Sequence, residues 1–181
     1  MPAENHFIIM ISKSMSDALN GQINLEMWSS YLYLSMSLYF ESEGRRGFAN
    51  WYRVQSQEEY AHALALIDYV HSRGSRAVLQ PITGVPAVWE STLDAVVATF
   101  QHEQKVTEQI NALYSQAIEE KDYATRQMLN AFIAEQVEEE ETVQHIIEDL
   151  SLVGNDGTGL FQIDRELGTR TYQAPALSRK D

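Results

Sequence analysis

Six residues of metal-binding type form two copies of one spacing pattern. In each copy a single residue is followed 33 positions later by a pair that is spaced three apart: Glu26, Glu59 and His62, then Glu103, Gln136 and Glu139. Corresponding members of the two copies lie 77 positions apart. A repeat of this kind predicts a site with approximate twofold symmetry that is built from two similar halves.

Two residues at the same height in a helical hairpin have numbers whose mean is the position of the turn. For Glu26 and Glu59 that mean is 42.5, which falls in the segment 42–44, Ser-Glu-Gly. For Glu103 and Gln136 it is 119.5, close to the next expected helix break. The pattern therefore predicts two hairpins, each of which brings one pair of these side chains face to face.

The surroundings of these residues distinguish them from an ordinary charged surface. Glu103 has Phe100 and Val106 three positions away on either side, and Glu139 has Val143 one turn later. Four carboxylates in an apolar interior would repel one another and become protonated unless cations neutralised them. Oxygen and imidazole donors without sulfur, with one bridging residue in each half, favour a pair of Fe²⁺ or Mn²⁺ ions with open positions for O₂.

Long amphipathic helices are predicted to position these residues, so the expected fold class is all-α. The four Pro residues leave room for helices over residues 12–42, 45–73, 91–121 and 122–153. Residues 75–90 contain two Pro and show no helical period. At an extended rise of roughly 3.3 Å per residue this connection can span a helix, so the third helix can run parallel to the second.

A shorter helix is predicted over residues 158–167. Its apolar residues, Leu160, Phe161, Ile163 and Leu167, are too few to form a core of their own. They also have no obvious place to pack within one bundle. We therefore expect this helix to contact another subunit.

Composition and charge exclude several functional classes. The 181 residues include 26 acidic and 13 basic side chains, for a net charge of −13, which argues against nucleic acid as a partner. The absence of Cys excludes disulfides, a thiolate nucleophile, iron–sulfur clusters and zinc ribbons. The apolar run over residues 7–11 is far too short for a membrane span or a secretory segment, so a cytoplasmic protein without a membrane partner is expected.

The sequence resembles bacterial non-haem ferritin, a member of the ferritin-like di-iron family. The matching segments are INLEMWSSYLY, QEEYAH, HEQ, AEQVEEE and GLFQIDREL, which are spread from Met10 to Gly168. The resemblance implies an up-down-down-up four-helix bundle with a long crossover and a short fifth helix. It also implies ferroxidase activity, the oxidation of Fe²⁺ at a centre within each subunit, and storage of the ferric mineral inside a homo-oligomeric shell of 24 subunits.

The resemblance divides the chain into four expected segments. Residues 1–11 would be an N-terminal extension outside the family pattern, and residues 12–153 would form the di-iron bundle. Residues 154–170 would carry the short helix and its oligomer contact, and residues 171–181 would be a flexible tail.

Carried over residue by residue, the resemblance implies two iron sites that share a bridging glutamate, Glu59. The first would be formed by Glu26, Glu59, His62 and Glu103, and the second by Glu59, Glu103, Glu139 and, more weakly, Gln136.

A third, inward-facing iron position is also implied by the resemblance. It would be lined by Glu58, Glu135, Glu138 and the second oxygen of Glu139. Because Glu58 and Glu59 are adjacent, they point about 100° apart on a helix and cannot serve identical positions around one ion. A solvated acidic surface remains the alternative interpretation of the same glutamates.

Other residues near the centre have different expected roles. Tyr33 matches the family's tyrosine beside the centre, where it would supply an electron or a hydrogen bond. Ala131 stands where better-known members carry Trp, so an electron-donor step through that Trp is not carried over. His71, His102 and His145 are expected to be surface or hydrogen-bonded residues without a metal role.

Haem is not an expected cofactor. Bacterioferritin repeats the Glu-x-x-His pair on its fourth helix and has a haem-ligating Met after the second-helix glutamate, whereas this chain has Gln136-x-x-Glu139 and Glu59-Tyr60. Two alternatives to iron storage remain open at the level of sequence. One is a di-iron oxidase or peroxidase that stores nothing, and the other is a metal-free helical scaffold.

Overall fold

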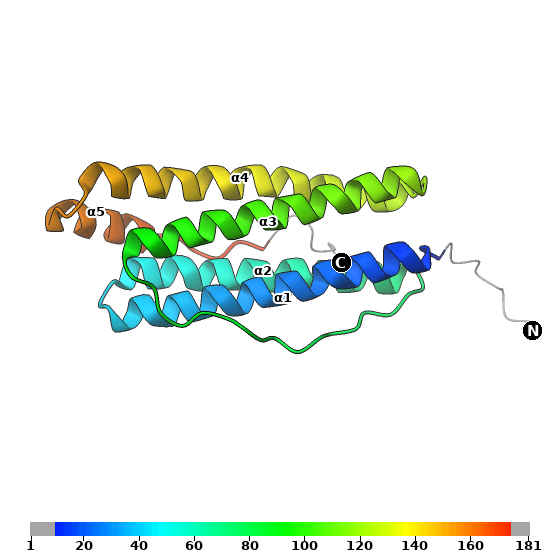
Figure 1. The fold of residues 1–181 in the computed structure, drawn as a ribbon, viewed down its shortest axis with the longest axis horizontal. Helices are drawn as coiled ribbons and strands as arrows, with labels where there is room; N and C mark the ends of the chain where they lie inside the picture. The colour runs from blue at the N-terminus through cyan, green and yellow to red at the C-terminus, as the bar shows by residue number, and fades with distance from the viewer. Residues whose placement is uncertain (1–9, 175–181) are drawn as a thin grey trace, which may run out of the picture.

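Four long helices run alongside one another and form the body of the protein (Figure 1). The computed structural model describes residues 10–174, so the expected N-terminal extension lies almost wholly, and the expected tail partly, outside the described residues. The described helices are α1 (Lys13–Ser42), α2 (Arg46–Ser72), α3 (Thr92–Glu119), α4 (Tyr123–Val153) and α5 (Gly157–Leu167). The predicted all-α, up-down-down-up bundle with a short fifth helix is confirmed. Within residues 10–174 no helix is long and apolar enough to cross a membrane.

Side-chain caps start the helices where the sequence predicts them. Ser12 Oγ accepts a hydrogen bond of 2.9 Å from the backbone N–H of Met15, and Ser91 Oγ accepts one of 3.0 Å from that of Asp94. Asp122 caps α4 in the same way. These oxygens satisfy amides that have no acceptor within the first turn, an effect worth about 1 kcal/mol per cap.

The long crossover from α2 to α3 is fastened to a row of polar residues on α1. Asn20 and Asn24 bond to backbone groups of residues 76–80, and Trp28 Nε1 donates to the carbonyl of Thr83 over 2.9 Å. These bonds satisfy backbone groups of a segment that has no regular structure. The crossover therefore lies along the outside of α1, and α3 begins at the end of the bundle where α2 begins (Figure 1).

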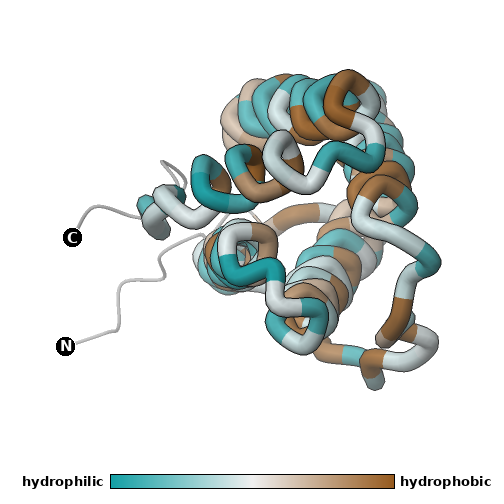
Figure 2. Tube along the Cα trace, turned by 90° about the vertical axis from the view of Figure 1, so that its left-hand side faces the viewer, coloured by the Kyte–Doolittle hydropathy of each residue, from teal (hydrophilic) through white to brown (hydrophobic). Residues whose placement is uncertain are grey.

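The apolar core is divided into two clusters, one toward each end of the bundle. The cluster near the α1–α2 turn includes Tyr33, Phe40 and Tyr52, while the other includes Leu19 and Ile23, all of them fully buried. Viewed end-on, the helices surround one interior, and each is a mixture of hydrophilic and hydrophobic residues along its length (Figure 2). Every long helix contributes to both clusters and leaves its middle free for other side chains.

The expectation that the fifth helix finds no place within its own bundle is wrong. Leu160, Ile163 and Leu167 pack against the core cluster near the α1–α2 turn, although Phe161 remains 61% exposed. The side chain of Asp164 accepts hydrogen bonds of 2.9 and 3.0 Å from the first amides of α2, whose own N-cap residue supplies no side-chain bond. The carboxylate on α5 is thus the N-terminal cap of α2, a contact that spacing within either helix could not reveal. The oligomer contact of this segment stays a prediction.

Gly47 permits this close approach, and its substitution is the first test of the fold. A Cβ at position 47 would lie 1.5 Å from the backbone oxygen of Asp164, so Gly47→Ala must push α5 away from α2. We expect a loss of about 2 kcal/mol and a thermal midpoint roughly 4–8 °C lower, measured by calorimetry. Gly21→Ala is the matched control, because a Cβ there meets no atom within 4 Å and alanine favours the helix. Equal midpoints for the two variants would contradict the proposed close packing.

Candidate metal centre

The residues of the predicted repeat meet in the gap between the two apolar clusters. Glu26 lies on α1, Glu59 and His62 on α2, Glu103 on α3 and Gln136 on α4. All five are at most 5% exposed, although none belongs to either core cluster. The two predicted hairpins therefore place their polar side chains at one height, as the mean of the residue numbers indicated.

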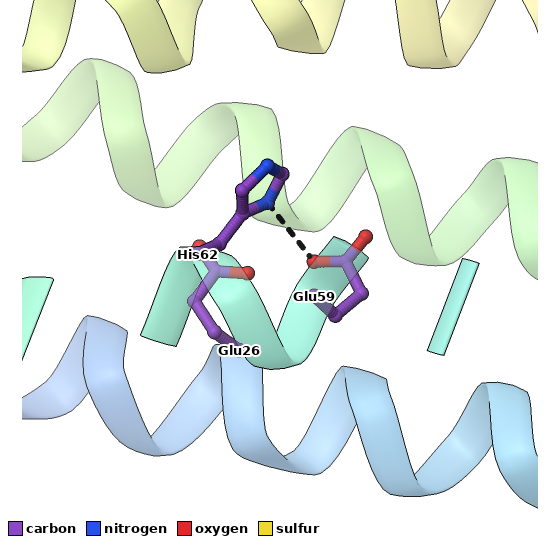
Figure 3. Close-up of side chains that lie close together, drawn as sticks. All are labelled: Glu26, Glu59 and His62. Atoms are coloured by element: carbon purple, nitrogen blue, oxygen red, sulfur yellow. Dashed lines mark ion pairs between the residues drawn. The ribbon is translucent and has the colours of Figure 1, made fainter. Parts of the chain in front are cut away.

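Three of these side chains form the tightest group of potential metal ligands within residues 10–174. Glu26, Glu59 and His62 each offer one ligand atom, and these atoms all lie within 4.8 Å of one another. His62 Nδ1 lies 3.5 Å from a carboxylate oxygen of Glu59 (Figure 3). The other ring nitrogen of His62 lies 2.9 Å from a carboxylate oxygen of Glu135. The side chains converge from α1 and α2, as expected for one half of the centre.

The other half of the repeat is held by hydrogen bonds. Gln136 Nε2 donates to a carboxylate oxygen of Glu103 over 3.2 Å, which confirms the predicted pairing across α3 and α4. The hydroxyl of Tyr33 also donates to Glu103, so the tyrosine lies beside the centre as predicted. Gln55 Nε2 donates to Glu139 over 2.7 Å. Glu103 and Glu139 thus flank the tight group of three without belonging to it in this structure.

Burial and mutual repulsion raise the pKa of three of the carboxyl groups, which favours their protonated, uncharged form. Burial, together with the negative charge of Glu59, raises the pKa of Glu26 well above its ordinary value. Burial and the charges of Glu59 and Glu139 raise the pKa of Glu103 well above its ordinary value as well. Burial and Glu59 raise the pKa of Glu139 to about 7. The metal-free centre therefore retains protons that a bound cation would displace.

The pKa values of Glu59 and His62 are shifted against the direction that burial alone would give. Burial acts to raise the pKa of Glu59, but the hydrogen bond and charge of His62 lower it overall. For His62, burial acts to lower the pKa, but hydrogen bonds to Glu135 and Glu59 and the nearby carboxylates raise it well above its usual range. The protonated imidazole is therefore the positive charge that keeps Glu59 ionised while no metal is bound.

The donor set fits a divalent cation. Glu26 Oε2 is buried and has no hydrogen-bond partner within the described chain, while its other oxygen accepts a bond of 2.7 Å from Gln22. A buried oxygen without a partner carries a cost that a bound ion removes. One imidazole and several carboxylates, without sulfur, are the donors that suit iron or manganese.

The glutamates predicted to form a third position gather beside this centre. Glu58, Glu135, Glu138 and Glu139 line one cavity of about 220 Å³ between α2 and α4. Arg170, from the segment after α5, lines the same cavity and forms an ion pair with Glu58. Burial raises the pKa of Glu58, and the Arg170 guanidinium opposes that rise. The arginine was not expected from the sequence.

Comparison with known proteins gives a consistent result. The sequence profile of the ferritin-like domain matches residues 16–153. The bacterial non-heme ferritin of Bacteroides fragilis is 47% identical over 161 residues, which cover 89% of this chain and 100% of that protein. This chain belongs to the ferritin family. A bacterial non-heme ferritin of Staphylococcus aureus is 36% identical over 163 residues, 90% of this chain and 98% of that protein.

Solved structures extend the likeness to three dimensions. The open-pore ferritin of the hyperthermophilic archaeon Archaeoglobus fulgidus has a TM-score of 0.88 and 46% sequence identity, covering 89% of this chain and 98% of that chain. An engineered closed form of the same ferritin gives a TM-score of 0.88 over 90% of this chain. The family resemblance inferred from the motifs is confirmed.

Two residues of this ferritin support the centre but were not singled out from the sequence. Gln22 and Gln55 precede Glu26 and Glu59 by four positions, and each donates a hydrogen bond to its glutamate. This spacing of one helical turn was a visible signal. His102, which was predicted to have no metal role, is buried against Trp28 with Ser29 Oγ at 2.7 Å. Burial lowers the pKa of His102 to about 4, so its ring is neutral, in agreement with a hydrogen-bonded residue that has no metal role.

The raised pKa of Glu139 makes the stability of the metal-free protein depend on pH. The unfolded carboxyl group has an ordinary value of 4.5, and the folded one titrates at about 7. Between these values the folded state keeps a proton that the unfolded state has lost, so this contribution to stability falls as pH rises from about 4.5 to 7. Relative to Glu139→Gln, the metal-free wild type should lose thermal stability over that range, and bound Zn²⁺ should suppress the loss. A difference between the two proteins that stays constant from pH 4.5 to 8 would contradict the assigned shift.

Proposed function

We propose that this ferritin oxidises Fe²⁺ with O₂ or peroxide at a centre within each subunit and stores the ferric product in a hollow shell. The observation that carries the proposal is the convergence of Glu26, Glu59 and His62, with a buried carboxylate oxygen that lacks a partner. Membership of the ferritin family and the similarity to bacterial non-heme ferritins support the same assignment.

Two substrate ions would be held by the two halves of the repeat. Glu26, Glu59, His62 and Glu103 would bind the first Fe²⁺, while Glu59, Glu103, Glu139 and, more weakly, Gln136 would bind the second. Binding requires ionised carboxylates and a neutral imidazole, so protons leave Glu26, Glu103, Glu139 and His62 as Fe²⁺ enters. Each Fe²⁺ then gives up one electron, and O₂ takes up two electrons and two protons to form hydrogen peroxide. The anionic ligands favour this step, because they stabilise Fe³⁺ more strongly than Fe²⁺.

Tyr33 would act as a positioning residue for Glu103. Its hydroxyl donates to that carboxylate, and burial together with the charge of Glu103 raises the pKa of the phenol well above its ordinary value. A phenol that remains protonated keeps its hydrogen bond at every working pH. One oxygen of Glu103 is thereby fixed while the other bonds to Gln136.

Exposed apolar side chains on α1 and α2 support assembly into a shell. Tyr31, Leu34 and Leu38 recur at helical spacing on α1, and Tyr60 and Leu64 do so on α2, with exposures from 37% to 58%. Apolar groups repeated along one helix face are typical of surfaces that another subunit covers. We infer a homo-oligomer of 24 subunits. The net charge of −13 would concentrate Fe²⁺ near such a shell.

Removing a ligand of the first ion tests the oxidation step. Glu26→Ala or His62→Ala should slow the fast phase of aerobic Fe²⁺ oxidation by at least about tenfold, the scale seen when even an outer-shell partner of a metal is lost. The shell should remain folded, since neither residue belongs to a core cluster. Glu108→Ala on the exposed face of α3 is the control. Fast oxidation at the wild-type rate in both ligand variants would refute the assignment.

The native mass tests the storage function separately. We expect a particle of about 24 times the 20.6 kDa chain, which retains iron far in excess of two ions per subunit after aerobic loading. Light scattering with iron analysis of the isolated particle measures both quantities. A mass of one or two subunits would exclude storage, while retention of only two irons per subunit would favour an oxidase that stores nothing.

A further inference from the structure

Arg170 lines the acidic cavity beside the candidate centre. The residue lies three positions after the end of α5, where the chain turns back along the bundle (Figure 1). The cavity of about 220 Å³ is lined by four glutamates, Glu58, Glu135, Glu138 and Glu139. Arg170 adds a guanidinium, which carries a permanent positive charge, to the wall of this cavity and pairs it with Glu58.

Contacts with α2 hold Arg170 on several sides. One terminal nitrogen pairs with Glu58, and the other donates to Gln55 Oε1 over 2.6 Å. The guanidinium carbon lies 4.8 Å from the centroid of the Trp51 ring, within the range of a cation–π interaction. The side-chain amide of Asn50 donates to the backbone oxygen of Arg170 over 2.9 Å. The ion pair is mostly shielded, with side-chain exposures of 24% for Arg170 and 15% for Glu58.

Gln55 connects this arginine to the second half of the centre. Its carbonyl oxygen accepts from Arg170, so its amide nitrogen is directed toward Glu139, to which it donates over 2.7 Å. The guanidinium therefore compensates one glutamate of the cavity directly and fixes the hydrogen bond of another through Gln55. A cation that enters the cavity would compete for both glutamates.

We propose that Arg170 is an internal counter-ion that occupies the third cation position, so that a divalent cation binds between Glu58 and the glutamates of α4 only when the guanidinium leaves. The inference rests on the proposed function, because it assigns this cavity to a cation of the same centre. Displacement of Arg170 also removes the donor that orients Gln55 and one anchor of residues 168–174 on α2. Occupation of the third position and release of this segment are consequently coupled, and anything that frees the segment strengthens cation binding.

Zn²⁺ titration of the metal-free assembled protein tests the proposal without any redox reaction. Calorimetry should show two tight ions per chain and a weaker third one. In Arg170→Gln the third ion should bind on the order of tenfold more tightly, while the first ion, which Glu139 does not bind, keeps its affinity. Arg170→Lys keeps the positive charge and should bind the third ion no more than a few-fold more tightly than the wild type. Arg53→Gln removes one exposed positive charge from the same helix and should match the wild type.

Hydrogen exchange supplies a second measurement on the same samples. In the wild type, amides of residues 168–174 should exchange faster once the third Zn²⁺ binds, and not while the two tight sites fill. Absence of the tight pair would refute the proposed function. The role of Arg170 would be overturned if the affinity for the third Zn²⁺ were unchanged or lower in Arg170→Gln, or if it increased equally in Arg53→Gln. It would also be overturned if no variant bound a third ion, or if Zn²⁺ left the hydrogen-exchange protection of residues 168–174 unaltered.

Discussion

A group of carboxyl side chains buried halfway along the bundle is the constraint on which the rest of the structure depends. Glu26, Glu59 and Glu103 are at most 2% exposed, Glu139 lies beside them at the cavity, and ion pairs or hydrogen bonds only partly compensate this group. Such a group lowers the stability of the metal-free fold. The two apolar clusters on either side supply the stability that the middle lacks. Helices of 27 to 31 residues follow from this arrangement, because each must pass through one cluster, the centre and the other cluster.

The internal repeat is symmetric in position but not in chemistry. His62 corresponds to Glu139, and Glu59 corresponds to Gln136. One half therefore brings an imidazole whose charge keeps Glu59 ionised, while the other half brings an amide and a carboxyl group with a raised pKa. Two ions in such a centre would experience different fields and different proton requirements. The fold places the ligands of both halves at the same height along the bundle. The types of side chain make the two metal positions chemically different.

The bundle and the position of the centre could be predicted because both depend on local periodicity. Helix ends follow from caps such as Ser91 and Asp122, and the facing pairs follow from equal distances to a turn. Arg170 could not be found in this way, since the segment that carries it has no period and its place depends on where α5 packs. The same applies to Asp164, whose partner amides lie 116 and 117 residues earlier in the chain. Contacts made by a short terminal element depend on the finished tertiary structure, and single-sequence patterns carry little information about them.

The cap that Asp164 provides to α2 can form only late in the synthesis of the chain. During synthesis the α1–α2 hairpin is complete long before residue 164 is joined to the chain, so the first amides of α2 remain without their carboxylate acceptor. The end of the nascent hairpin that carries its turn therefore lacks this cap until α5 has been made. A polypeptide released early would retain all four long helices yet lack this cap. The docking of α5 thus completes the N-terminus of α2 only after all four long helices have been synthesised.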